Sequence, residues 1–263
     1  MRYLAWLLWL PLLFVATAAA AEPSASDIMR RSVDAYRVLG IEATLTLTII
    51  DEAGRTRERV LDLASRGVRG EGVEQRLLRF RSPADVKGTG LLSIDRDGGT
   101  RLLWLYLPAL KKTRRIASAE RSRSFVGSEF SYADIVPPAW ADFDYRTLGH
   151  ETVAGVACTV IEATPRTSTV ADELGGKRRV VWVDAATGAL WRAAYYDAND
   201  RLFKEFEVSK VEVVDPKNGL LLTTRATMRN RTNKRSSTLA VDQWKLRTDL
   251  SENFFSQREL ERP

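Results

Sequence analysis

Side chains that perform chemistry in most enzymes are rare in this sequence. Among its 263 residues there is one histidine, His150, and one cysteine, Cys158. One histidine cannot build a histidine-based metal cluster, and a catalytic triad around it has no evident partners. The apolar run from Val156 to Ile161 favours a buried, unreactive thiol at Cys158. We therefore expect a surface or turn role for His150 and no reactive role for Cys158.

Two carboxylates, Glu129 and Asp134, flank an aromatic segment and could work as an acid and a base. A protonated acid opposite an ionised base is the arrangement that hydrolyses glycosides. Such pairs arise by chance in a chain with 34 acidic residues, and helix capping or salt bridges to nearby arginines are simpler roles. We predict a protein that is not an enzyme and has no cofactor or metal, with a hydrolase as the last alternative.

The stretch from Leu102 to Ile135 is the most informative part of the chain. Its first strand, Leu102 to Leu107, places Leu103 and Leu105 on one face and Trp104 and Tyr106 on the other. A strand that is apolar on both faces must be covered on both faces. Pro108 ends the strand because proline has no N–H to donate.

A basic run and an aromatic segment follow this strand. The basic run contains Lys111, Lys112, Arg114 and Arg115. The aromatic segment, which we define as residues 124–135, contains Phe125, Phe130 and Tyr132 around the small residues Gly127 and Ser128. An apolar wall, a cationic rim and a segment able to bend predict a pocket with a movable cover.

At these residues the chain resembles the LolA-like outer membrane lipoprotein-sorting proteins of Gram-negative bacteria. The resemblance rests on LP followed by basic residues and RRI, then SFVGSEFSYADI. It extends to RFRSPADVKGTGLLSI (79–94), AGVACTVIEATP (154–165) and VVWVDAATGALWRAAYYD (180–197). It implies a periplasmic protein whose long antiparallel sheet curls into an incomplete barrel, with helices over the open face and a cavity for acyl chains. Members of this branch often accompany RND-type inner-membrane exporters, which makes such an exporter the implied partner.

The N-terminus indicates export. Met1 to Ala21 has a positive start, an apolar core and an alanine cluster suited to cleavage, which is the pattern of a secretory signal peptide. The remaining residues, 22–263, contain no linker-like run, so we expect one domain there. The net charge of +6 favours an anionic partner, such as a lipid headgroup or an acidic protein surface. Nucleic acid is not expected, because the chain has no recognised binding motif.

Alternation of apolar and polar residues predicts a mainly β fold. A helix is expected from Ser24 to Leu39, followed by a meander of strands separated by short turns. In Leu202 to Val213 and again after Val241 the apolar positions change parity, which predicts β-bulges. Bulges of this kind curl a long sheet, so the pattern itself predicts a curved antiparallel sheet.

The preferred function is a non-enzymatic carrier that shields acyl chains of a lipoprotein or lipid on its concave face and touches membranes transiently. The alternative is a sensor or accessory subunit that binds an envelope protein. The expected lipid-binding residues are Leu45, Leu47, Ile49, Trp104, Tyr106, Phe125, Phe130, Tyr132, Trp182 and Trp191. Lys112, Arg114 and Arg115 are expected to contact a headgroup or partner. Alternatively, Arg114 and Arg115 pair with Glu129 and Asp134 and pin the aromatic segment shut.

Overall fold

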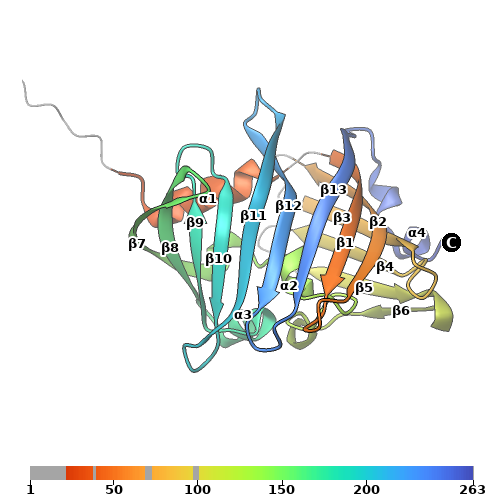
Figure 1. Cartoon of the computed structure of the whole chain (residues 1–263). Coiled ribbons are helices and arrows are strands. Elements are labelled where there is room, and N and C mark those ends of the chain that lie inside the picture. Colours follow the sequence, from red (N-terminus) through yellow and green to blue (C-terminus); the bar gives the residue numbers. More distant parts are fainter. Residues whose placement is uncertain (1–21, 38–39, 69–72, 97–100, 263) are drawn as a thin grey trace, which may run out of the picture.

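The computed structural model describes residues 22–37, 40–68, 73–96 and 101–262, and in this part of the chain thirteen strands form one antiparallel sheet (Figure 1). The expected signal peptide lies outside the described residues. The strands are β1 (Gly40–Ile50), β2 (Thr56–Val68), β3 (Val73–Ser82), β4 (Gly90–Arg96), β5 (Leu102–Leu107), β6 (Lys112–Arg115), β7 (Phe143–Val153), β8 (Val156–Pro165), β9 (Arg178–Val183), β10 (Leu190–Tyr196), β11 (Leu202–Asp215), β12 (Leu220–Asn230) and β13 (Ser236–Leu246).

The strand order is β6-β5-β4-β3-β2-β1-β13-β12-β11-β10-β9-β8-β7. Strands that follow one another in the sequence therefore pair with each other, except for β6 and β7, and one further pair joins β1 to β13. The sheet consists of two meanders joined at that pair, with Leu47 opposite Leu239. The sheet is curved but not closed, because β6 and β7 remain as its two edges (Figure 1).

The curvature is accompanied by the bulges that the sequence predicts. The register shifts on either side of Lys210 in β11, and it shifts again in β13, where Thr44 faces Gln243 but Leu45 faces Val241. An extra residue on one strand bends it and reverses the side chains that follow. Both predicted parity changes are thus confirmed as irregularities of the ladder.

The concave side of the sheet, here called the inner face, carries the main hydrophobic core. In β1 every second residue from Ala43 to Ile49 is buried, and these side chains join apolar residues of most other strands. The helices α1 (Ala25–Ala35) and α2 (Tyr132–Ile135) lie behind the strands in Figure 1 and contribute Ile28, Met29 and Tyr132 to the same core. Ser24 caps α1 by accepting a hydrogen bond from the backbone N–H of Asp27 at 3.1 Å.

The opposite, outer face is covered over β2 to β5 by the C-terminal segment, residues 247–262. This segment contains a 3-10 turn, η4 (Glu252–Phe254), and the short helix α4 (Gln257–Leu260). Its side chains Leu250, Phe255 and Leu260 pack with outer-face residues of the sheet, including Trp104 and Tyr106 of β5. Leu103 and Leu105 belong to the inner core. The prediction that β5 is covered on both faces is therefore confirmed.

Short helical elements also lie next to strands near both edges of the sheet. These elements are η1 (Pro108–Leu110), η2 (Ser118–Glu120), η3 (Trp140–Asp142) and α3 (Ser168–Leu174). Glu173 of α3 forms ion pairs with Arg101, which precedes β5, at 3.0 Å, and with Arg121, which follows η2, at 3.2 Å. All three side chains are largely buried, so this seam cluster ties one end of the sheet to the other. No helix within the described ranges combines the length and apolar character needed to cross a membrane.

Candidate functional site

The inner face is lined by the apolar residues expected from β1 and by the aromatic segment. Leu45, Leu47 and Ile49 project from β1, and Leu47 is only 1% exposed. Phe125, Phe130 and Tyr132 belong to the same cluster and are also buried. The structure thus brings together six of the ten side chains that the sequence assigned to lipid binding.

The aromatic segment folds back on itself so that its rings point into the core. The N–H of Phe125 donates to the carbonyl of Phe130 at 2.7 Å, and a β-bridge joins Ser124 to Ser131. Gly127 has a φ of +76° in the turn between them, a conformation that favours glycine. The hydroxyl of Ser128, buried in the turn, donates to the carbonyl of Phe125 at 2.8 Å. The tight turn therefore sets Phe125 and Phe130 side by side.

These rings occupy the inner face. The Phe125 ring lies 5.6 Å from the ring of Phe80 on β3 and 5.9 Å from that of Tyr132, measured between centroids. The Phe130 ring lies 6.4 Å from that of Phe206 on β11, edge to face. Such distances are typical of packed aromatic pairs. The aromatic segment is therefore a plug within the inner core, rather than a cover standing over an open cavity.

Glu129, at the tip of the aromatic segment, is held by the β12–β13 hairpin. Its carboxylate forms an ion pair with Arg235 at 3.0 Å and accepts a hydrogen bond from the side chain of Asn230 at 2.9 Å. Its backbone N–H donates to the hydroxyl of Ser237 at 3.0 Å. Arg235 also donates to the carbonyl of Gly127. These polar contacts fasten the tip to a hairpin more than a hundred residues further along the chain.

A second attachment lies at the other end of the segment. Asp134 forms an ion pair with Lys204 of β11 at 2.7 Å, and both side chains are 7% exposed. The same carboxylate accepts a hydrogen bond from the N–H of Ser131 and so caps α2. The ammonium of Lys204 also lies over the ring of Tyr195. Burial, together with the nearby charge of Asp134, raises the pKa of Tyr195, which keeps this phenol neutral.

A third attachment comes from Arg59 of β2, which donates to the carbonyl of Val126. Sequence reasoning missed Arg59, Lys204 and Arg235 as partners of the aromatic segment. For two of them a signal was present: Arg59 shares its face of β2 with Leu61, and Lys204 shares its face of β11 with Phe206. A charged residue at an inward position requires a partner, although parity alone does not say which one.

The pairing expected for the basic run differs in the structure. Arg114 forms an ion pair with Glu120 at 3.1 Å, whereas Glu129 and Asp134 pair with Arg235 and Lys204. The expectation that Arg114 and Arg115 pin the segment through these two carboxylates is therefore wrong. The reason is topological, because β6 is an edge strand and the aromatic segment turns away from it into the core.

The basic strand β6 nevertheless borders the inner face on one side. Lys112 pairs with Leu107 and Arg114 with Leu105, so both basic residues share the face of two inner-core leucines. Arg114 is close enough to Tyr132 for its charge to oppose the rise that burial causes in the pKa of Tyr132. Arg115 pairs with Trp104 and belongs to the outer side. Lys112 and Arg114 are therefore the cations at the rim of the inner face.

Four aromatic residues expected on the concave surface lie elsewhere. Trp104 and Tyr106 pack under the C-terminal segment, and Trp182 and Trp191 belong to an outer-face cluster around Cys158. The expectation of one surface shared with Leu45 and Leu47 is therefore wrong. The parity within each strand was identified correctly, but both faces of these strands are apolar and parity cannot choose between them.

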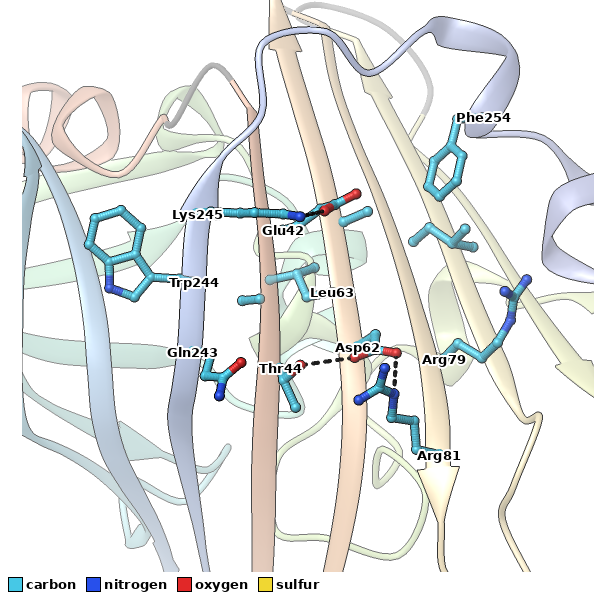
Figure 2. A pocket seen from close by; sticks show the side chains of 13 residues that line it. Glu42, Thr44, Asp62, Leu63, Arg79, Arg81, Gln243, Trp244, Lys245 and Phe254 are labelled. Atoms are coloured by element: carbon cyan, nitrogen blue, oxygen red, sulfur yellow. Dashed lines mark hydrogen bonds and ion pairs between the residues drawn. The ribbon is translucent and has the colours of Figure 1, made fainter.

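The outer face holds a cleft of about 450 Å³ between β13, β1, β2, β3 and the C-terminal segment. In Figure 2 the side chains of Glu42 and Lys245 meet at one end, and a chain of contacts runs from Thr44 through Asp62 to Arg81 at the other. The cleft is lined by Glu42, Ala43, Thr44, Asp62, Leu63, Ala64, Leu77, Arg79, Arg81, Gln243, Trp244, Lys245 and Phe254. No local pattern in the sequence indicates this cleft.

Two residues considered for chemistry are placed as expected. His150 lies on the exposed surface of edge strand β7, and the thiol of Cys158 is buried. Burial raises the pKa of the Cys158 thiol, which disfavours the thiolate. Across the residues that the structure describes, no group of three histidine, cysteine, aspartate or glutamate side chains could hold a metal ion.

The fold and parts of the sequence are similar to known proteins. A family model with the description "-like: Uncharacterized protein" matches residues 72–262. A crystal structure described as an outer membrane lipoprotein-sorting protein domain from Vibrio parahaemolyticus superposes with a TM-score of 0.82 at 26% identity, covering 90% of this chain and 98% of that one. A DUF1329 family protein from Desulfovibrio piger gives a TM-score of 0.81 at 27% identity, with 90% and 97% covered.

A third solved structure supports the fold alone. A LolA superfamily protein from Nitrosomonas europaea has a TM-score of 0.68 at 18% identity, covering 90% of this chain and 99% of that one. No curated protein matches the sequence.

Proposed function

The chain belongs to the family whose model matches residues 72–262 and has the fold of LolA-like lipoprotein-sorting proteins, and on that premise we propose that it carries acyl chains of a lipoprotein or lipid through the periplasm. The observation that carries the proposal is the aromatic plug. An apolar inner face is filled by the rings of a segment that is not a strand of the sheet and is attached to it by ring packing and a few polar contacts. Such a segment can leave the face without unpairing any strand.

The energies favour an exchange of plug and cargo. Burying Phe125, Phe130 and Tyr132 is worth roughly 1.5 to 3 kcal/mol for each side chain, so about 5 to 9 kcal/mol together. An acyl chain of about 14 methylenes gains roughly 11 kcal/mol when it is buried, at about 0.8 kcal/mol for each methylene. The two totals are comparable. An incoming acyl chain can therefore replace the plug and remain exchangeable.

Lys112 and Arg114 give the rim of the inner face its proposed headgroup preference. A guanidinium can hold a phosphate or carboxylate in a forked contact. Arg114 is bound to Glu120, which also accepts from Arg123, so a headgroup would compete with one shared carboxylate. The proposed donor is an RND-type inner-membrane exporter, and contact with the membrane would be transient.

The first test is lipid analysis of protein purified from its own envelope. Mass spectrometry should find one lipid class copurifying reproducibly. Protein that is free of lipid but bound to a stable protein partner would instead favour the accessory-subunit alternative.

The second test concerns the plug. Glu129→Gln removes the charge that Arg235 holds, so the open state becomes more populated and a fluorescent fatty acid should associate severalfold faster. Glu207→Gln, which breaks the exposed pair with Arg229, is the matched control and should leave the rate unchanged. Equal association rates for the two variants would contradict the plug mechanism.

The third test separates the rim from the outer side. Arg114→Ala should weaken binding of an anionic amphiphile about tenfold more than that of a neutral one of equal chain length, because a charge-assisted contact is lost. Arg115→Ala, the adjacent arginine on the other side of the strand, is the control. If Arg115→Ala has the larger effect, the rim assignment is wrong.

A further inference from the structure

The outer cleft shown in Figure 2 lies on the opposite face of the sheet from the inner core. Its lining residues Glu42, Thr44, Asp62 and Ala64 alternate along β1 and β2 with inner-face residues such as Leu45 and Leu61. The sheet itself therefore separates the cleft from the aromatic plug. A ligand of the cleft would not enter the inner core.

The carboxylates of the cleft already have cationic partners. Glu42 forms ion pairs with Lys245 at 3.0 Å and with Arg247 at 2.8 Å. Asp62 forms an ion pair with Arg81 at 2.7 Å and accepts from the hydroxyl of Thr44 at 3.1 Å. With both acids neutralised, the remaining charge of the lining is that of Arg79.

Arg79 is the cation of the cleft without an acidic partner among the described residues. One of its terminal nitrogens donates to the carbonyl of Glu259 in α4, so the guanidinium is held beneath the C-terminal segment. Its Nε is closed off from solvent and has no hydrogen-bond partner. A partly buried guanidinium without a counter-ion costs stability, and an anion bound beside it would offset that cost.

An apolar surface adjoins this charge. Ala64 and Leu77 face each other across β2 and β3, are buried, and belong to the cluster under the C-terminal segment. In Figure 2 the ring of Phe254 stands beside the cleft on the C-terminal segment. The cleft thus offers one unpaired cation next to an apolar wall, in a volume typical of small-molecule sites.

We propose that the outer cleft binds a single-chain anionic amphiphile. Its carboxylate or phosphate lies against Arg79, and its apolar chain lies over Ala64 and Leu77 against Phe254. The ligand class is shared by free fatty acids and by alkyl phosphates. A neutral or cationic amphiphile of the same length lacks the attraction to Arg79.

Backbone amide shifts in NMR test the proposal directly. Decanoate, decyl phosphate, decanol and inorganic phosphate are each titrated into the purified protein. We expect saturable shifts at Ala64, Leu77 and Phe254 with the two amphiphilic anions, at least tenfold weaker binding of decanol, and no saturation with phosphate alone. Whichever of decanoate and decyl phosphate binds more tightly identifies the preferred headgroup. Binding of decanol as tight as that of decanoate would overturn the proposal.

Two variants and one control complete the test. Arg79→Gln keeps a donor for the Glu259 carbonyl but removes the charge, so decanoate should bind about tenfold more weakly while decanol is unaffected. Phe254→Ala should weaken both ligands about equally. Arg225→Gln, which removes an exposed arginine of β12, controls for net charge and should change neither. If the Arg79→Gln variant binds decanoate as tightly as the Arg225→Gln variant does, the binding site is not the cleft.

The two binding hypotheses fail separately. Shifts confined to inner-face amides such as Leu47 and Phe125 would support the carrier proposal and overturn this one. Shifts confined to the cleft residues would support the cleft proposal and contradict the carrier proposal.

Discussion

Gly90 of β4 shows how a single residue fixes the position of the C-terminal segment. A Cβ at this position would lie 2.6 Å from a methyl carbon of Leu260. Real Cβ contacts are essentially never that short, so a side chain at this position would force the fully buried Leu260 side chain to move. The glycine therefore serves close packing rather than backbone freedom.

Gly90→Ala should release α4 from the outer face. We expect faster cleavage of the C-terminal segment in limited proteolysis and a loss of about 1 to 3 kcal/mol of unfolding free energy. Leu260→Ala removes the methyl group that clashes. In a Leu260→Ala background, Gly90→Ala should therefore cost less protection from proteolysis than it does in the parent protein. Strictly additive effects would show that the contact is not the cause.

Leu47 is the residue where burial changes an expectation from the sequence. If Leu47 lined an open cavity, Leu47→Asp would block lipid binding and leave the sheet folded. Since Leu47 is fully enclosed in the core, an aspartate there would be a buried unpaired charge and would threaten folding itself. Leu47→Ala should lower the unfolding free energy by about 2 to 5 kcal/mol in urea titrations, whereas an Ala variant of exposed Leu110 should stay within about 0.5 kcal/mol.

At the scale of elements, β10, β11 and the loop after β12 meet at Glu205. Its buried carboxylate accepts from Arg192 at 2.9 Å and from Arg231. Burial raises the pKa of Glu205, but the two arginines outweigh it and hold the pKa below its usual 4.5. A carboxyl with a lowered folded pKa contributes stability above its unfolded pKa, and this contribution is lost as pH falls through the folded pKa.

Glu205→Gln should therefore be less stable than the parent protein at pH 7. The difference should shrink as pH falls below about 4.5 and vanish once Glu205 is protonated in the folded parent. Urea midpoints measured from pH 7 to pH 3 check this. A difference that is independent of pH would assign the effect to packing.

Strands were predictable because their alternation is local. Leu102–Leu107 was identified with its observed bounds, and the bulges of β11 and β13 followed from parity alone. The short helices α3 and α4 were missed, since four to seven residues carry too little periodicity and their positions are set by packing. The predicted helix from Ser24 to Leu39 ends earlier, at Ala35, and Val38 and Leu39 lie outside the described residues.

The candidate site was predictable only in part, for a related reason. The aromatic segment was found because its composition is unusual, and the resemblance gave the architecture. The partners of Glu129 and Asp134 could not be found, because Arg235 and Lys204 lie 106 and 70 residues away and meet them only through the sheet order. The outer cleft depends on where the C-terminal segment lies, which no strand pattern indicates.

At the scale of the whole molecule, the seam cluster of Arg101, Arg121 and Glu173 replaces the hydrogen bonds that would close a barrel. Glu173→Gln leaves two largely buried arginines without their shared carboxylate. Removing one partner of a buried pair costs about 3 to 5 kcal/mol, so urea unfolding should show a loss near the lower figure. Asp144→Asn, which breaks the exposed pair with Arg166, is the control and should cost about 1 kcal/mol or less.

The pairing of β1 with β13 bears on how the chain acquires its structure. Each meander can begin to form from neighbours in the sequence, but β1 waits for a partner that is made almost two hundred residues later. Until β13 is complete, both half-sheets have an open edge at the middle of the future core, where chains can pair with one another instead. The stage before β13 joins β1 is therefore the one at which this chain is most open to pairing with other chains.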